Sequence, residues 1–274
     1  TTKKLSLRLP QHNGPVPNRR RVDMAQRNNV LAYCNQVLQP QLFKDYCPNG
    51  LQVEGRSEIR KIISGVTASR ALIEAAIAQG ADTLLVHHGL FWRGQDGSVT
   101  GWLKQRLALL LAHDINLLAY HLPLDAHAQW GNNAQLGELM GWQVTDRFGD
   151  QALGMVGRPA QAEVNAQTLT RALKDKMGTT PVAVVPNPSR AIQRIAWCTG
   201  GAQSWFESAI AAGADAFVTG EISEPQAHLA HETGVAFFAC GHHATERYGA
   251  PALAAHVSEH FGIAHEFIDI PNPA

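Results

Sequence analysis

The feature that most constrains the fold of this chain is an internal repeat. Residues 62–88 (IISGVTASRALIEAAIAQGADTLLVHH) align without a gap to residues 195–221 (IAWCTGGAQSWFESAIAAGADAFVTGE). In each copy an apolar, β-branched run precedes an alanine-rich stretch, a Gly-Ala-Asp turn and a second apolar run, which predicts a strand, a helix and a strand. The identical pairs are Ile62/Ile195, Glu74/Glu207, Ala76/Ala209, Ile77/Ile210, Ala78/Ala211, Gly80/Gly213, Ala81/Ala214 and Asp82/Asp215.

The similarity between the two halves continues on both sides of these segments. NLLAYHLPLDAH (116–127) matches FFACGHHATERY (237–248), which places His121 on His242 and Asp125 on Glu246. The helices predicted after these segments end at Gly141 and Gly262, and each leads to a predicted strand (142–148 and 265–270). Upstream, a helix near 27–38 with a strand at 51–55 resembles a helix near 164–177 with a strand at 181–185.

This pattern predicts a tandem duplication of one α/β unit. Strands and helices alternate, which favours mainly parallel sheets covered by helices on both faces. A repeat of this length indicates two domains, the first at 24–150 and the second at 151–274. Because ligands bind such sheets at the carboxyl ends of the strands, a cleft between the domains is the expected site.

Charge and composition narrow the function classes. Residues 1–23 carry six basic residues and a single acidic one, and we interpret them as a disordered extension or leader. The net charge is zero, so the rest of the chain is mildly acidic and binding to nucleic acid is not expected. No apolar run reaches the length of a membrane helix, and four scattered cysteines indicate a reduced, cytoplasmic protein.

Histidines and carboxylates at the predicted strand ends indicate a metal site. His87 and His88 end the strand LLVHH, and His242 with Glu246 forms an HxxxE pair one helical turn apart. His121 and Asp125 form the equivalent pair in the first repeat. Imidazoles and carboxylates suit zinc, iron or manganese, and five or six ligands exceed what one tetrahedral ion takes. Two ions that share a bridging group fit this number better.

Each of these patterns also has an ordinary structural explanation. Paired histidines are often surface or hydrogen-bonded core residues, and i,i+4 pairs commonly just stabilise helices. The coincidence of three separate elements at strand ends favours metal binding. Glu221, opposite His88 in the repeat, is either an acid/base group or a helix cap or ion-pair partner. Seven other histidines lack this placement: His113, His127, His228, His231, His256, His260 and His265. We interpret most of them as solvated or helix-end residues, and His231, equivalent to His113 in the repeat, as structural.

The motifs NGLQVEG, GADTLLVHHGLFW, HLPLDAH, TGE, GHHATER and FIDIPNPA closely resemble the Nif-three-like family, whose bacterial members carry the name GTP cyclohydrolase 1 type 2 homologue. The resemblance runs from Met24 to Ala274. It implies two similar, intertwined three-layer α/β/α domains, with the C-terminal segment packing on the first domain, and a toroidal homohexamer. It also implies a two-metal site whose ligands are His87, His88, Asp125, His242 and Glu246.

The resemblance further implies opening of the imidazole ring of GTP by a metal-bound hydroxide. Glu221 and His121 are then the residues that could move protons. The alternative is a non-enzymatic, ring-shaped protein that binds or handles metal, or contacts a partner. Phosphoester hydrolysis by the same ions is a third option. An open coordination position favours an enzyme, whereas a closed ligand shell favours the non-enzymatic alternative.

Overall fold

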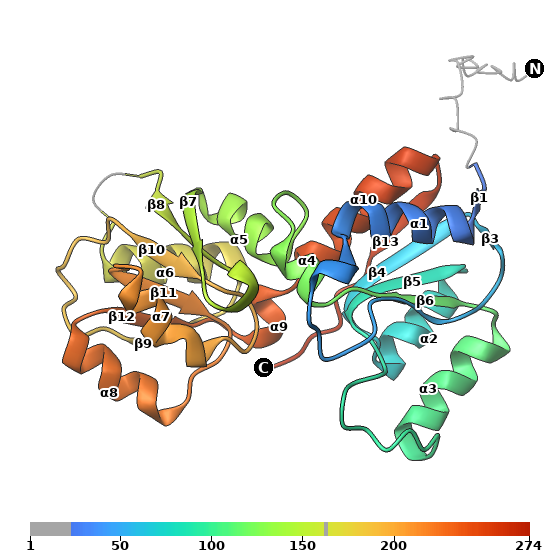
Figure 1. The fold of residues 1–274 in the computed structure, drawn as a ribbon, viewed down its shortest axis with the longest axis horizontal. Coiled ribbons are helices and arrows are strands. Elements are labelled where there is room, and N and C mark those ends of the chain that lie inside the picture. Colours follow the sequence, from blue (N-terminus) through green and yellow to red (C-terminus); the bar gives the residue numbers. More distant parts are fainter. Residues whose placement is uncertain (1–22, 162–163) are drawn as a thin grey trace, which may run out of the picture.

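The computed structural model describes residues 23–161 and 164–274 and has a mixed α/β fold, with parallel and antiparallel strands. Figure 1 shows two sheet-containing bodies side by side, joined through α4, α5, α9 and α10. The prediction of a disordered extension or leader concerns residues 1–23, of which residues 1–22 lie outside the described residues. Within the described ranges, no helix combines the length and apolar character needed to cross a membrane.

The first sheet has five strands, four of which run parallel. Two helices pack on one face, against a core that includes Ile62, Leu85 and Leu118, and two others pack on the opposite face against Ile63 and Leu84. This alternation of neighbours between the two faces is the expected period of a strand. The strand order is β13 (Ala264–Phe267), β4 (Lys61–Thr67), β5 (Thr83–His88), β6 (Asn116–Ala119) and antiparallel β2 (Gly50–Val53); α1 (Arg27–Leu38) and α10 (Gly249–Phe261) cover one face, and α2 (Arg70–Ala78) and α3 (Gly101–Ala112) the other.

The second sheet has six strands and is also covered on both faces. One core contains Trp197, Val218 and Phe238, and the other contains Phe217 and Phe237. The strand order is β7 (Trp142–Phe148), β8 (Gly154–Pro159), β10 (Ile195–Trp197), β11 (Ala216–Thr219), β12 (Ala236–Ala239) and β9 (Val182–Val184); α5 (Asn132–Met140) and α6 (Ala166–Met177) cover one face, and α7 (Phe206–Ala211) and α8 (Glu224–Thr233) the other.

The prediction of mainly parallel strands is wrong for this second sheet. Only β10–β11 and β11–β12 pair in parallel, whereas β7–β8, β8–β10 and β9–β12 pair antiparallel. For β7 and β8 the cause is the short connection through residues 149–153. So short a connection can join only antiparallel neighbours.

The chain crosses between the two sheets. Strand β7, from the first half of the chain, pairs with β8 in the second sheet, and α5 joins its core. Strand β13, from the end of the chain, pairs with β4 in the first sheet, and α10 packs beside it. The last helix and strand of each half of the chain therefore pack with the sheet of the other half.

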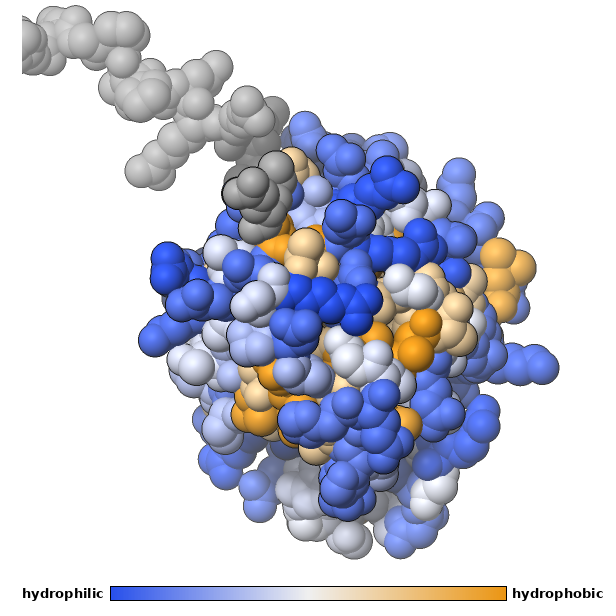
Figure 2. Space-filling model, turned by 90° about the vertical axis from the view of Figure 1, so that its left-hand side faces the viewer, coloured by the Kyte–Doolittle hydropathy of each residue, from blue (hydrophilic) through white to orange (hydrophobic). Residues whose placement is uncertain are grey.

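Local sequence signals explain where the helices begin and end. The Ser69 hydroxyl accepts a hydrogen bond from the backbone of Leu72 at the start of α2. Gly141 and Gly262, which are equivalent in the repeat, end α5 and α10 with left-handed φ angles of 73° and 70°. The end face on the side of the second sheet is mainly hydrophilic, with small apolar areas scattered over it (Figure 2).

The carboxyl ends of the parallel strands of both sheets point toward the junction between them. β5 ends at His88, β6 is followed by the short helix α4 (Leu122–Ala126), and β12 is followed by the short helix α9 (His242–Thr245). The topology thus brings the histidines of the two halves to one place.

Candidate metal centre

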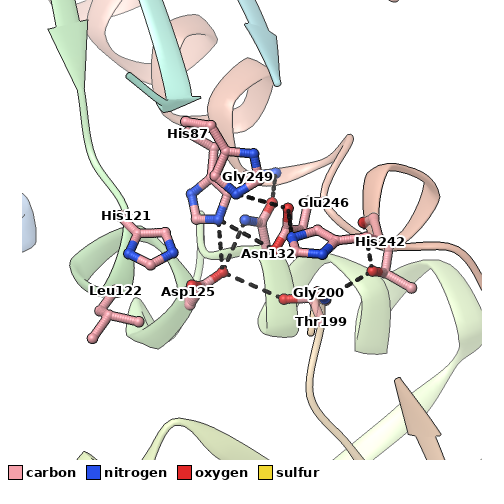
Figure 3. A network of polar contacts seen from close by, with 12 residues as sticks. His87, His121, Leu122, Asp125, Asn132, Thr199, Gly200, His242, Glu246 and Gly249 are labelled. Carbon is pink, nitrogen blue, oxygen red and sulfur yellow. Dashed lines mark hydrogen bonds and ion pairs between the residues drawn. The ribbon is translucent and has the colours of Figure 1, made fainter. Parts of the chain in front are cut away.

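Six side chains converge at this junction, and we call them the His/carboxylate cluster. They come from the end of β5, from the start and body of α4, and from α9 and the residue that follows it. Figure 3 shows several of them facing one another. The members are His87, His88, His121, Asp125, His242 and Glu246.

Glu246 lies at the centre of the cluster. Its Oε1 is 3.4 Å from Nε2 of His87, and its Oε2 is 3.2 Å from Nε2 of both His88 and His242. Nε2 of His87 also lies 3.5 Å from Oδ1 of Asp125. Asp125 and Glu246 are therefore both close enough to the twin histidines to share a ligand with them.

Three overlapping groups in the cluster each have ligand atoms within 4.8 Å of one another. Glu246 belongs to two of these groups and so occupies the position of a bridging ligand. The groups are His87 with Asp125 and Glu246, His88 with His242 and Glu246, and His87 with His88 and His121.

All four imidazoles are held in the same way. Each has its Nδ1 in contact with an oxygen outside the cluster, which leaves Nε2 for the centre. This arrangement fixes the ring orientation, and the carbonyl and carboxylate partners also select the tautomer that a metal ligand needs. The contacts are His87 Nδ1 with the Tyr120 carbonyl (2.9 Å), His88 Nδ1 with Thr67 Oγ1 (3.1 Å), His121 Nδ1 with Asp45 Oδ1 (2.7 Å) and His242 Nδ1 with Glu221 Oε1 (2.6 Å).

Two buried atoms of the cluster fit a metal ion better than any protein group. Among the described residues, Nε2 of His87 and Oε2 of Glu246 have no hydrogen-bond partner. Both residues are buried, at 0% and 3% exposure. An unpaired polar atom in such a place is costly, and a divalent ion would satisfy both.

The electrostatics of the cluster centre on its two carboxylates. Burial alone would lower the pKa of His87, but Asp125 and Glu246 outweigh it and raise this pKa to about 10. Burial would raise the pKa of Glu246, yet His87 and His88 hold it well below its usual range. Burial, aided by the charge of Glu246, raises the pKa of Asp125.

The other two imidazoles with shifted pKa values differ in environment. Burial lowers the pKa of His88 to about 3, and the neighbouring imidazoles add to this against the attraction of Glu246. The close contact of its Nε2 with Glu246 Oε2 leads the causes that raise the pKa of His242 to about 9, against burial and together with Glu221. Without metal, the cluster therefore holds protons that a cation would displace.

Asp125 is oriented by residues that lie outside the His/carboxylate motifs of the sequence. Asn132 Nδ2 and Thr199 Oγ1 donate to its Oδ1 at 3.0 and 3.3 Å. Asn132 Oδ1 in turn accepts from the backbone of Gly249 at 2.7 Å. Asn133 accepts from the Thr199 backbone at 2.9 Å and so links α5 to the loop after β10. Both asparagines are fully buried, at 0% exposure, which marks them as part of the network around Asp125. In the sequence, their position before a predicted helix suggests only helix capping.

The two residues predicted to move protons occupy different places. His121 lies in the cluster with His87 and His88. Glu221 contacts the outer nitrogen of His242 and accepts from Gln203 Nε2 at 3.0 Å. Its hydrogen bond with His242 is the main cause of its lowered pKa. This contact places Glu221 behind His242, not against the centre of the cluster.

The histidines predicted to lie outside the site have other partners. His243 contacts Asp269 at 2.8 Å, which agrees with the choice of His242 as the member of the HHATE motif that faces Glu246. His256 contacts the Tyr33 hydroxyl, and His265 contacts Ser64, both at 2.8 Å.

A cavity of about 270 Å³ opens beside the cluster. His121, Asp125, His242 and Glu246 line one part of it. Residues from both halves of the chain form the remaining wall, including Tyr46, Asp150, Gln151, Ser204 and Trp205. The cluster is therefore accessible from one side, as a site for chemistry must be.

Fold and cluster together define a mixed α/β protein with buried His, Asp and Glu groups that could hold metal ions. A model of the Duf34/NIF3 (NGG1p interacting factor 3) family matches residues 25–273. The chain belongs to this family, which confirms the resemblance seen in its motifs.

Curated relatives support the same assignment. A Neisseria meningitidis serogroup A protein is 53% identical over 251 residues, covering 92% of this chain and 100% of its own, and an Escherichia coli K12 protein is 44% identical over 246 residues, covering 88% and 96%. Both are named GTP cyclohydrolase 1 type 2 homolog.

Solved structures show the same fold. The protein ybgI, described as of unknown function, is 44% identical with a TM-score of 0.87, covering 91% of this chain and 100% of that one. A protein from Thermus thermophilus is 33% identical with a TM-score of 0.83 and the same coverage.

Proposed function

We propose that this protein binds two divalent metal ions and is a hydrolase that acts on a nucleotide or a related heterocycle. The observation that carries the proposal is the common arrangement of four imidazoles around two buried carboxylates. Each outer nitrogen is held by an oxygen, and each Nε2 is left for the centre. Structural ion pairs do not require this uniform orientation, whereas metal ligands do.

The proposed ligands divide into two sets that share Glu246. His87 and Asp125 form one set with it, and His88 and His242 form the other. The donor chemistry suits zinc, iron or manganese. When bound, such ions would polarise the substrate and lower the pKa of a bound water molecule to near neutrality.

The residues around the cluster orient the ligands and shape access to them. Glu221 holds His242, and Asn132 with Thr199 holds Asp125. The cavity admits a substrate on the side of His121 and His242. Proton transfer by His121 or Glu221 stays a prediction.

GTP is the first substrate to test, because the curated relatives carry the name GTP cyclohydrolase 1 type 2 homolog. The aromatic rings of Tyr46 and Trp205 in the cavity wall are compatible with a planar heterocycle. An open cavity next to the ligands favours this enzymatic role over a protein that only stores or handles metal.

We also propose that the chain arose by tandem duplication of a three-layer unit and assembles as a cytoplasmic homohexameric ring. The pairs that are equivalent in the repeat, His121 with His242 and Asp125 with Glu246, meet in one cluster, which supports the duplication. The oligomeric state follows from the family resemblance and can be measured by light scattering.

The function can be tested by metal analysis followed by a nucleotide panel. Asp125→Ala and Glu246→Ala should each lose bound metal, while Glu259→Ala, an exposed change on α10, should keep it. If the two cluster variants hold as much metal as the parent protein, the ligand assignment is wrong. If GTP and the other nucleotides stay intact with fully loaded protein, the hydrolase proposal fails and the metal-handling alternative takes its place.

A further inference from the structure

Asp45, in the loop between residues 43 and 49, is a buried carboxylate with an unusual number of partners. Its side chain is 4% exposed. Oδ1 contacts His121 Nδ1 at 2.7 Å and accepts from the Tyr46 backbone at 2.6 Å. Oδ2 accepts from the Leu122 backbone at 2.9 Å and from Asn49 Nδ2 at 2.8 Å. Four groups therefore fix the direction of this carboxylate.

We propose that Asp45 is the positioning residue that makes His121 a metal ligand, and that Gln151 holds Asp45 in place from the other half of the chain. The inference rests on the proposed metal site and adds His121 to its ligands. A carboxylate on Nδ1 selects the tautomer with the proton on Nδ1 and the lone pair on Nε2. That lone pair then lies in the group formed with His87 and His88.

Gln151 reaches the Asp45 loop through two hydrogen bonds. The Lys44 backbone amide donates to Gln151 Oε1 at 2.7 Å, and Gln151 Nε2 donates to the Lys44 carbonyl at 3.3 Å. Gln151 lies in the short turn between β7 and β8, which belong to the second sheet. The contact therefore links the loop that orients His121 to the opposite wall of the cavity.

The turn that presents Gln151 is strained. Gln151 and Ala152 have φ angles of 52° and 54°, a left-handed conformation that side chains with a Cβ rarely adopt. Two consecutive residues of this kind persist only where the surroundings impose them, and such strain is concentrated at binding sites. The pair of hydrogen bonds to Lys44 gives a reason for glutamine at this position.

The fixed direction of Asn49 predicts what an asparagine at position 45 would do. Asn49 Oδ1 accepts from the His121 backbone at 2.7 Å, so its Nδ2 must face residue 45. Both partners on the Oδ2 side, Asn49 Nδ2 and the Leu122 amide, are thus donors. The amide oxygen in Asp45→Asn faces these two donors, because the other side has a single backbone donor, the Tyr46 amide, which then loses its acceptor. The NH₂ group of the asparagine faces His121 Nδ1. His121 can accept this donor only by moving its proton to Nε2, which removes that lone pair from the cluster.

The first experiment measures the His121 tautomer and zinc affinity together. Histidine-labelled protein is examined by long-range ¹H–¹⁵N correlation, with and without zinc, and zinc affinity is measured by competition with a chelator. In the parent protein we expect the proton on Nδ1. In Asp45→Asn we expect it on Nε2, with zinc affinity about 10- to 100-fold lower. Asp96→Asn, an exposed change, should alter neither.

Each contrary result has its own meaning. If His121 keeps its Nδ1 proton in Asp45→Asn, the positioning role is refuted. If the proton moves but zinc affinity is unchanged, His121 is not a ligand. A parent protein that binds neither zinc, iron nor manganese contradicts the proposed function instead, and the tautomer of the metal-free protein still tests the role of Asp45.

Gln151→Gly provides a second variant that does not depend on Asp45→Asn folding. It relieves a left-handed φ and removes the hold on Lys44, so zinc affinity should fall several-fold without any loss of thermal stability in the metal-free protein. If Gln151 had a purely structural role, zinc affinity would not fall while thermal stability was kept. Asp114→Gly is the matched control, because Asp114 (φ 50°) lies before the amino end of β6, whereas the carboxyl end of β6 leads to His121. The zinc affinity of this variant should not change. Unchanged affinity in Gln151→Gly would refute the role of Gln151.

Discussion

Replacing Gly200 with alanine should disable the cluster through a single methyl group. Gly200 has a φ of 71°, and a Cβ there would lie 2.1 Å from Glu246 Oε1 and 3.2 Å from His242 Nε2. Its backbone has little freedom to retreat, because its amide donates to Thr245 Oγ1 and its carbonyl accepts from the Gly220 amide, both at 2.9 Å. The carboxylate of Glu246 must therefore move.

The expected magnitude has two parts. The left-handed backbone alone costs an alanine about 1–2 kcal/mol. Overpacking against a buried carboxylate adds about 1–3 kcal/mol. An ordinary carbon–oxygen contact is well above 3 Å, so Glu246 has to shift by roughly an ångström, which is enough to remove it from both ligand sets.

The assay compares metal content and unfolding free energy for Gly200→Ala and Gly141→Ala. Gly141 has nearly the same φ, 73°, but no atom within 4 Å of the added Cβ, so it reports the backbone cost alone. We expect both variants to lose stability in denaturant titrations with chelator present, and only Gly200→Ala to lose metal. Full metal content in Gly200→Ala would show that Glu246 is not a ligand, and equal losses of both quantities in the two variants would refute the steric argument.

Three further predictions follow from the same geometry. Asn132→Ala leaves the Gly249 amide without an acceptor and removes a donor from Asp125, so it should lower the unfolding free energy by about 1–3 kcal/mol, measured by denaturant titration; an unchanged value would contradict this network. The pKa values of His87 (about 10) and His242 (about 9) mean that both carry protons at pH 7 in the metal-free protein. Metal must displace these protons, so affinity should rise with pH up to about 9–10, with about two protons released in calorimetry with buffers of different ionisation enthalpy; affinity that is constant between pH 6 and 9 would argue against imidazole ligands. Removing metal with a chelator should lower the thermal midpoint, because an ion at 100 times its Kd stabilises the folded state by about 2.7 kcal/mol; an unchanged midpoint in protein that has lost its metal would show that the ion binds elsewhere than in the folded core.

The sequence could predict the strands that carry the ligands because these strands are buried and continuous. The runs that end at His88 and lead to His121 are apolar, and the repeat adds a second example of each. Strand β8 (GMVGRP) was not predicted, since two glycines and a proline in six residues weaken the strand signal. The antiparallel pairs that β8 makes with β7 and β10 were missed for the same reason.

Contacts between distant loops could not be read from the sequence. Asp45 lies in a polar loop with no periodicity, and its role depends on the packing of that loop against α4. Gly89 has no left-handed φ; a Cβ there would lie 2.1 Å from Gln52 Oε1, so close packing explains this glycine better than a turn. Gly200 likewise allows the backbone to approach Glu246, and its neighbour Gly201 lies beside Glu221.

The central claim is that four imidazoles and two carboxylates hold a pair of divalent ions. Anomalous difference maps from crystals grown with manganese or zinc test it most directly. The account predicts two peaks about 3.5–4 Å apart, one beside His87 and Asp125 and the other beside His88 and His242, with Glu246 between them. A cluster that shows no anomalous peak in saturating metal, while ions bind elsewhere on the chain, would contradict it.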